Sequence, residues 1–573
     1  SALSGVYGIE QIPASMIEHV EVMRGGGSAL FGSSAIAGTI NIITKEPMRN
    51  SGMLSHTITG IGDGDVFDNS TALNASLVTD DQRAGLYIFG QNRHRSAYDH
   101  DGDGYSEIPK LHGQTIGFRS FLKTTTYSKL TFEYHHMEEF RRGGDLLNRP
   151  PHEANVAEQT EHSINGGGLK FDYFSPNENH RFNVFASAQH INRDSYYGPG
   201  DRDPLDAYGN TTDLNWMAGS QYVYSFGKCI FMPSDLTAGI EFNQDKLEDN
   251  MWGYNRTVDQ KVNIGSAFLQ NEWKNDHWGF LIGGRLDKHN LIDHVIFSPR
   301  ANLRYNPTEN INLRFSYSSG FRAPQAFDED LHVENVGGNV AMVELADNLK
   351  EERSQSLSAS ADIYHRFGAF QVNFLVEGFY TKLSDVFALT DGEVVDGILT
   401  RTRHNASGAQ VLGLTLEGKM AYLNKIQVQA GVTLQQSHYS KPHIWNKEAP
   451  AVKKMMRTPN TYGYFTATYT PIKPLSIALS GTYTGSMLVP HEPVPGFLEN
   501  PITVNTKDFF DIGLKAAYDF KLYKSMNLQL NAGIQNIFNA YQDDFDKGAD
   551  RDSGYIYGPS LPRSFFAGVK ISY

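Results

Sequence analysis

The stretch DHDGDGYSE, which begins at Asp99, has carboxylates at positions 99, 101, 103 and 107. Calcium binds six to eight oxygen atoms, and alternating acids followed by a glycine resemble the start of an EF-hand loop. The residues predicted to bind the ion are Asp99, Asp101, Asp103, Tyr105 through its carbonyl group, and Glu107. Lys110 stands where a complete EF-hand would place its bidentate acid. Two interpretations stay open: a calcium site completed by another loop, and a solvated acidic loop without an ion.

Tyrosines are frequent in two further stretches, residues 194–208 and 540–562. A tyrosine ring packs against apolar ligand surface while its hydroxyl forms a hydrogen bond. The candidate ligand contacts are Tyr196, Tyr197, Tyr208, Tyr555 and Tyr557. Each could equally be an interfacial aromatic or a loop filler. Catalysis is not expected, because the sequence has no G-x-S-x-G nucleophile elbow and scattered serine, histidine and aspartate do not define a site.

The elements that position these residues are predicted from alternation of apolar and polar residues, clearest in 311–319, 526–535 and 565–573. Successive strand side chains point to opposite faces, so each segment has one apolar and one polar face. A soluble β-sandwich would show the same local pattern. However, the polar faces are rich in Asn, Gln and Ser, and strands of about ten residues cross a bilayer at a tilt. Because unpaired strand edges cannot lie in lipid, we expect an all-β transmembrane barrel.

The connections between these segments alternate in length. Short polar turns at 80–82, 306–309 and 470–474 contrast with long connections at 192–214, 321–352 and 540–562. Outer-membrane barrels have short periplasmic turns and long extracellular loops. Residues 48–573 accommodate about 22 antiparallel strands, a size at which the lumen must be plugged. This predicts a multi-pass barrel in the bacterial outer membrane, surrounded by its lipid, with the Asp99 loop on the extracellular side.

Composition excludes other classes of protein. The chain of 573 residues has a formal net charge of −14 and no long basic block, so nucleic acid is not an expected partner. Its single cysteine, Cys229, excludes a disulfide scaffold.

Residues 12–45 do not share the alternation. They read as a helix-sized stretch, a β segment near 20–23, a glycine turn and a second β segment at 39–44. The ordered string includes Val20-Glu21-Val22, Arg24-Gly25, Ser28-Ala29-Leu30-Phe31-Gly32 and Gly38-Thr39-Ile40-Asn41-Ile42-Ile43-Thr44. It resembles the C-terminal part of the plug of TonB-dependent outer-membrane receptors.

This resemblance implies a plug portion in residues 1–47, a barrel in 48–573, and energy coupling by the TonB–ExbB–ExbD complex. We expect the earlier half of the plug and the TonB box to lie outside this sequence rather than to have been removed from the protein. Arg24 is expected inside the barrel, where an unpaired guanidinium would be costly to bury. The resemblance implies that Arg24 pairs with barrel carboxylates, which the sequence does not identify; a purely structural role is the alternative.

A second signature follows residue 319. Gly320-Phe321-Arg322-Ala323-Pro324 and Asp347-Asn348-Leu349-Lys350 resemble the FRAP and NPNL boxes of receptors for haem, siderophores and cobalamin. His332 lies between the two boxes and is either a ligand contact, as in haem receptors, or a surface hydrogen-bonding group. The second box departs from the pattern, because Asp347 stands where proline is usual.

The stretch FRAPQAFDEDLH, the calcium-like loop and the tyrosines of 194–208 look most like the vitamin B12 receptor branch of the family. In that branch calcium orders acidic loops and a surface lipoprotein can cap the barrel. The expected function is TonB-dependent import of a scarce small ligand, with cobalamin or another corrinoid as the expected cargo. A haem or ferric-siderophore receptor is the alternative within the family. An outer-membrane enzyme and a passive porin are alternatives from other classes, and the plug fragment argues against the porin.

Overall fold

One closed antiparallel sheet dominates the computed structural model, which describes residues 12–573 except 37, 200–206, 337–338 and 397. Its 22 strands pair in chain order, and β31 closes the barrel against β3. At the seam, the Gly52 and Tyr573 backbones exchange hydrogen bonds of 3.2 and 2.9 Å. Each of the 22 strands is therefore paired on both edges, as a sheet in lipid requires. The prediction of an all-β transmembrane barrel of about 22 strands is confirmed.

The first strands of the barrel are β3 (Ser51–Ile61), β4 (Val66–Val78), β5 (Ala84–Arg95), β6 (Ser106–Thr125), β7 (Ser128–Gly144), β8 (Val156–Phe174), β9 (His180–Pro199), β10 (Tyr208–Cys229), β11 (Met232–Met251), β12 (Arg256–Lys274) and β13 (Trp278–His289). The others are β14 (Ile296–Thr308), β15 (Ile311–Arg322), β18 (Glu352–Phe367), β19 (Phe370–Ser384), β22 (Ala409–Tyr422), β23 (Ile426–His443), β25 (Thr461–Ile472), β26 (Leu475–Thr484), β29 (Phe509–Tyr523), β30 (Met526–Gln535) and β31 (Ser564–Ser572). The short β24 (Val452–Lys454) adds to the barrel beside β23.

Many strands are longer than the ten residues expected for a span, and β10 has 22 residues. The predicted loop at 192–214 is wrong, because β9 continues to Pro199 and β10 begins at Tyr208. Asn192 pairs with Thr212 in this extension. In this extension Tyr196 and Tyr197 pack in a buried apolar cluster with Ala157 and Met251, so strict apolar–polar alternation ends while the backbone hydrogen bonds continue. Alternation therefore marks the span of a strand in lipid and not the end of the strand.

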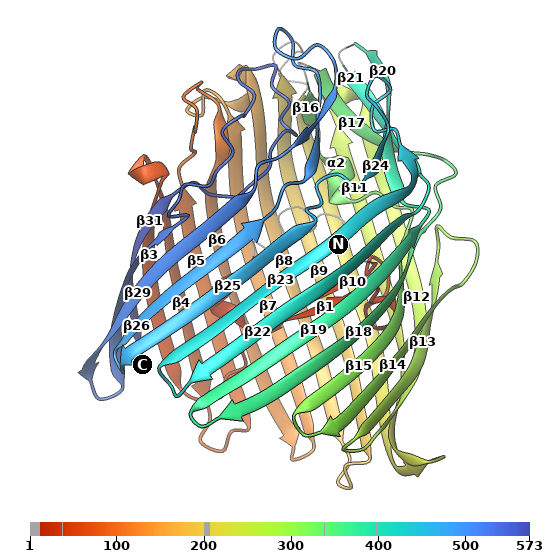
Figure 1. Cartoon of the computed structure of the whole chain (residues 1–573), viewed down its shortest axis with the longest axis vertical. Helices are drawn as coiled ribbons and strands as arrows, with labels where there is room; N and C mark the ends of the chain where they lie inside the picture. The colour runs from red at the N-terminus through yellow and green to blue at the C-terminus, as the bar shows by residue number, and fades with distance from the viewer. Residues whose placement is uncertain (1–11, 37, 200–206, 337–338, 397) are drawn as a thin grey trace.

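The outer surface carries the apolar side chains of the alternation, for example Leu54, Ile58, Ile240 and Ile282, all exposed on the barrel. Figure 1 shows tilted strands joined by short turns at one end, and by long loops at the other end. None of the helices among the described residues is long and apolar enough to cross a membrane.

The N-terminal segment lies inside the barrel, where Figure 1 shows β1 crossing the lumen. It contains a 3₁₀ turn (Ala14–Met16), β1 (Ile17–Arg24), α1 (Ser28–Phe31) and β2 (Gly38–Thr44), and β1 pairs with β2 as an antiparallel hairpin. Both predicted β segments are present. The predicted helix-sized stretch that begins at Ile12 is wrong, because these residues form only this 3₁₀ turn and the start of β1.

The long loops have secondary structure of their own at the loop end of the barrel. A four-stranded sheet contains β16 (Glu334–Val336), β17 (Asn339–Leu345), β20 (Phe387–Val395) and β21 (Ile398–Asn405), with β17 and β21 parallel. The hairpin β27 (Leu488–His491) and β28 (Ile502–Asn505), the helix α2 (Asp328–Leu331) and three 3₁₀ turns (Gly62–Gly64, Pro151–Glu153 and Trp252–Tyr254) complete the elements.

Candidate ligand-binding site

The acidic stretch lies in the extracellular connection between β5 and β6 and continues into the first residues of β6. One carboxylate oxygen from each of Asp99, Asp101 and Glu107 lies within 4.8 Å of the other two. The Asp99 carboxylate accepts hydrogen bonds of 2.7 and 2.8 Å from the N–H groups of Gly102 and Gly104. Both glycines have positive φ, 74° and 92°, which a residue with a Cβ rarely adopts. The glycine positions thus turn the loop so that three acids converge, an oxygen set that suits a hard cation.

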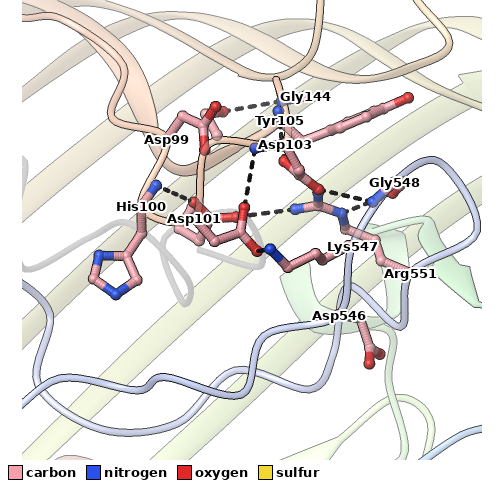
Figure 2. Close-up of polar contacts among 12 residues, drawn as sticks. Asp99, His100, Asp101, Asp103, Tyr105, Gly144, Asp546, Lys547, Gly548 and Arg551 are labelled. Carbon is pink, nitrogen blue, oxygen red and sulfur yellow. Dashed lines mark hydrogen bonds and ion pairs between the residues drawn. The ribbon is translucent and has the colours of Figure 1, made fainter.

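The Asp103 carboxylate is not one of these three and instead contacts the last long loop of the chain (Figure 2). Its Oδ2 lies 2.5 Å from Arg551 Nη2 and accepts a 2.7 Å hydrogen bond from the Gly548 N–H. Arg551 Nη1 also lies 3.1 Å from Glu107 Oε1, and the guanidinium lies 4.7 Å from the centre of the Tyr105 ring. We call this set of contacts around Arg551 the loop clamp.

A second cation reaches the acidic loop, because Lys547 Nζ lies 3.5 Å from Asp101 Oδ2. Burial opposes ionisation of Asp103, but backbone hydrogen bonds and the Arg551 charge outweigh it and lower the pKa of Asp103. The Asp103–Arg551 pair is therefore ionic at neutral pH, whereas burial raises the pKa of the Glu107 carboxyl on the other side of Arg551.

Replacing Arg551 with alanine is expected to separate the two loops, because two nearly buried carboxylates lose a shared partner. Hydrogen bonds to charged groups contribute about 1.5–3 kcal/mol each. Amide exchange in residues 96–107 and 546–556 should accelerate at least tenfold. In the wild type the lowered pKa of Asp103 stabilises the clamp above about pH 3.9, the ordinary aspartate value, and this stabilisation is lost as pH falls through the lowered value.

Lys507→Ala is the matched control, because Lys507 and its partner Asp543 form an exposed pair of 2.6 Å. Exposed pairs contribute about 0–1 kcal/mol, so this variant should leave exchange in residues 96–107 unchanged. Equal exchange in Arg551→Ala and wild type would contradict the clamp.

A cavity of about 260 Å³ lies beside the clamp. Its lining includes Tyr105, Glu107, Tyr197, His332, Arg551 and Tyr555. Thus β9, the loop after β15, the acidic loop and the last loop meet at one hollow, although they are far apart in the sequence.

Two of the five candidate tyrosines, Tyr197 and Tyr555, line this cavity. Tyr196 and Tyr208 contact each other edge to face, with ring centres 4.9 Å apart. The Tyr557 hydroxyl donates a 2.5 Å hydrogen bond to Asp544. The structure therefore brings together part of the predicted tyrosine set and holds the remaining members in packing contacts.

His332 also lines the cavity. Its ring lies edge-on to Tyr197 with a centroid distance of 5.1 Å, and its Nδ1 is 3.9 Å from Glu158 Oε1. Sequence reasoning missed His491, whose Nε2 lies 3.0 Å from Asp546 Oδ2 and whose ring stacks on Tyr555 at 3.8 Å. Asp546 and Tyr555 line the cavity. No local motif marks His491, because its partners lie in another loop.

The loop after β15 runs from the cavity to the plug portion. The Phe321 N–H donates a 3.0 Å hydrogen bond to Ser28 Oγ, and the Ser34 N–H donates a 2.8 Å bond to the Phe321 carbonyl. Residues 321–332, which we call the strap, then lead through α2 to His332. The FRAP-like residues thus dock the plug portion at one end of the strap, and the cavity lies at the other end.

Buried ion pairs hold α2 in place. Arg193, on β9, is 2% exposed and lies 2.9 Å from Asp328 Oδ1 and 3.8 Å from Asp249 Oδ1. Arg403, on β21, contacts Asp330. The guanidinium groups of β9 and β21 therefore compensate the negative charges of Asp328 and Asp330 in α2.

Arg24, at the end of β1, lies between two barrel carboxylates. Its Nη1 and Nη2 are each 2.9 Å from a carboxylate oxygen, of Glu377 and of Glu417 respectively. These residues belong to β19 and β22, which are neighbouring strands. They are the partners that the sequence left unidentified, and they tie the plug portion to the barrel wall.

A 22-strand barrel with a hairpin in its lumen and a loop-lined cavity at one end has the architecture of an outer-membrane receptor. The family model "TonB dependent receptor-like, beta-barrel" matches residues 52–537, and the model "TonB-dependent Receptor Plug Domain" matches residues 2–39. The chain belongs to the TonB-dependent receptor family, whose members are proteins of the Gram-negative outer membrane.

The chain is similar to an iron-regulated outer membrane virulence protein of Vibrio cholerae, at 26% identity over 58% of this chain and 49% of that protein. It is also similar to the vitamin B12 transporter BtuB of Vibrio vulnificus, at 22% identity over 57% of this chain and 51% of the transporter. The chain thus spans about half the length of these curated relatives.

Solved structures with the same fold include the siderophore receptor PirA of Acinetobacter baumannii. The match has a TM-score of 0.77 at 16% identity and covers 98% of this chain and 86% of PirA. A mutant of the ferric enterobactin receptor PfeA of Pseudomonas aeruginosa matches with a TM-score of 0.76 at 16% identity, covering 98% and 86% of the two chains.

Proposed function

We propose that the receptor containing this chain imports cobalamin or another corrinoid across the outer membrane by TonB-dependent transport. The TonB–ExbB–ExbD complex would supply the energy, and a surface lipoprotein would cap the loops. Family membership supports receptor function, and a relative named as a vitamin B12 transporter supports the cargo. Binding and release of an unmodified cargo require no catalytic group, so we propose a transporter and not an enzyme.

The observation that carries the choice of cargo is the charge of the cavity wall. The acidic side chains in the lining are Glu107, Glu158, Glu334, Asp546 and Asp552, against the basic Arg141 and Arg551. An acidic wall repels a strongly anionic ferric siderophore and accepts a neutral, amide-fringed ligand. Tyr105, Tyr197 and Tyr555 add ring faces for its apolar surface.

The cavity volume sets a condition on binding. At about 260 Å³ the cavity is smaller than the roughly 300–1,000 Å³ typical of drug-sized ligand sites. A corrinoid therefore needs the loops to move apart, and the loop clamp at Arg551 is the contact that opening would break. The measured affinity then equals the contacts that the ligand gains in the opened cavity minus the energy needed to break the clamp.

Calcium is the proposed structural ion of the acidic loop, held by Asp99, Asp101 and Glu107, whose oxygens converge. Glu107 also pairs with Arg551 and Asp101 with Lys547, so calcium would compete with both cations. Haem is the second candidate cargo, favoured by His332 in the cavity wall.

Cyanocobalamin, haemin and a ferric catecholate should be titrated into the purified full-length receptor, each with calcium and with a chelator. Nanomolar cyanocobalamin affinity is expected, and calcium removal should weaken it by about 5- to 150-fold, the range of typical coupling between sites. Asp101→Ala should reproduce the effect of the chelator. Asp81→Ala, in the short turn between β4 and β5, is the matched control and should bind as the wild type does.

Tight haemin binding that is lost in His332→Ala, with cyanocobalamin inert, would replace the corrinoid by haem and leave the transporter class intact. Tight catecholate binding would overturn the charge argument. Cyanocobalamin binding that ignores both the chelator and Asp101→Ala would remove calcium from the proposal.

A further inference from the structure

Two histidines face each other at the base of the hairpin that carries the acidic loop. His94 is near the end of β5, His112 is near the start of β6, and the two residues are directly paired across the strands. Their ring centroids are 5.8 Å apart, with the ring planes at 72°. Both side chains are exposed.

The pair lies on the outer surface of the barrel. The neighbouring residues Arg95 and Leu111 are buried, so His94 and His112 belong to the opposite, outward face. Ile88 and Ile116 are exposed on this same face, closer to the periplasmic end of the strands. The histidines therefore lie closer to the extracellular loop than Ile88 and Ile116 do, and level with Phe140, which pairs with His112.

Paired imidazoles in this arrangement have the chemistry of a chelate. Imidazole nitrogen is a preferred ligand of Zn²⁺, Ni²⁺ and Cu²⁺, with metal–nitrogen distances of about 2.0–2.1 Å. Two rings that share one ion at this distance have centroids about 5–6 Å apart, which matches the observed pair. Gln114, two residues beyond His112 on the same face, places its side-chain amide nitrogen 3.4 Å from His112 Nε2, and a metal bound at that nitrogen would displace this hydrogen bond.

We propose that His94 and His112 form a binding site for a divalent transition metal. The nearest cation along β6 is Lys110, two residues before His112, and its ammonium group lies 5.9 Å from the centre of the Phe140 ring. The metal would join β5 to β6 below the loop that holds Asp99, Asp101 and Glu107. The histidine nitrogens at the base of the hairpin favour a borderline metal such as Ni²⁺ or Cu²⁺. The carboxylate oxygens at its tip favour a hard cation such as Ca²⁺.

The test uses the tag-free full-length receptor in detergent, titrated with Ni²⁺ by calorimetry and with one equivalent of Cu²⁺ for electron paramagnetic resonance. The wild type should bind one equivalent of metal and show two equatorial nitrogen ligands on Cu²⁺. His94→Ala and His112→Ala should each weaken binding at least about tenfold, because the remaining imidazole binds without a chelating partner. Each variant should also lose the two-nitrogen signal.

His365→Ala is the matched control, since His365 is an exposed histidine on β18, beside Phe367. This variant should retain both affinity and spectrum, as should Asp101→Ala at the tip of the hairpin. Unchanged Ni²⁺ affinity in His94→Ala, or a two-nitrogen Cu²⁺ spectrum that persists in both histidine variants, would overturn the site. Because the substituted side chains are exposed, circular dichroism should show an intact barrel in every variant.

Discussion

Replacing Gly320 with valine is expected to displace the plug portion from the barrel wall. A Cβ at this position would lie 2.4 Å from the Ala35 carbonyl oxygen and 2.9 Å from the Ile36 Cα, and backbone atoms cannot yield as a flexible side chain does. Glycine in a strand commonly marks such a close backbone approach. The two hydrogen bonds of Phe321 to the plug portion, at the next residue, should be lost with the displacement.

The measurement is limited proteolysis and amide exchange of residues 12–45, both of which should increase by at least an order of magnitude. Gly378→Val is the matched control, because Gly378 is also in a barrel strand and a Cβ added there would have no atom within 4 Å. The control should retain a protected plug portion. Equal protection in both variants would show that the plug portion is not held against β15.

Replacing Arg193 with methionine is expected to release α2 from the barrel wall. The guanidinium is 2% exposed, and its removal leaves the Asp328 carboxylate without its 2.9 Å ion pair. Removing one partner of a buried pair typically costs about 3–5 kcal/mol, since the other charge stays desolvated. Because α2 lies within the strap, this loss should appear as local opening of residues 327–332.

Amide exchange of residues 327–332 measures this opening directly, and an increase of at least a hundredfold is expected. Arg181→Met is the matched control on the same strand, β9, because the Arg181 side chain is 43% exposed and its pair with Asp235 is 3.4 Å. An exposed pair contributes about 0–1 kcal/mol, so the control should leave the strap protected. If both variants exchange alike, the buried pair does not hold α2.

Local sequence determined the architecture because alternation is a property of neighbouring residues. Apolar and polar side chains must separate onto two faces wherever a strand passes through lipid, and the predicted segment 526–535 coincides with β30. The alternating lengths of the connections placed the acidic stretch among the long loops, and of the predicted ion-binding residues Asp99, Asp101 and Glu107 have carboxylates that converge. It failed at 192–214, where the strands continue past the lipid and pack against loop residues such as Val333 and Val340, which local sequence does not reveal.

Only the tertiary structure decided which charged side chains meet. Arg551 is 448 residues from Asp103, and Arg24 is 353 and 393 residues from Glu377 and Glu417. No periodicity or motif encodes such pairs, because an ion pair depends on the distance between two atoms in space and not on their separation along the chain. The closing of the barrel brings distant loops together, and it thereby assigns Asp103 to the clamp instead of to the three convergent acids.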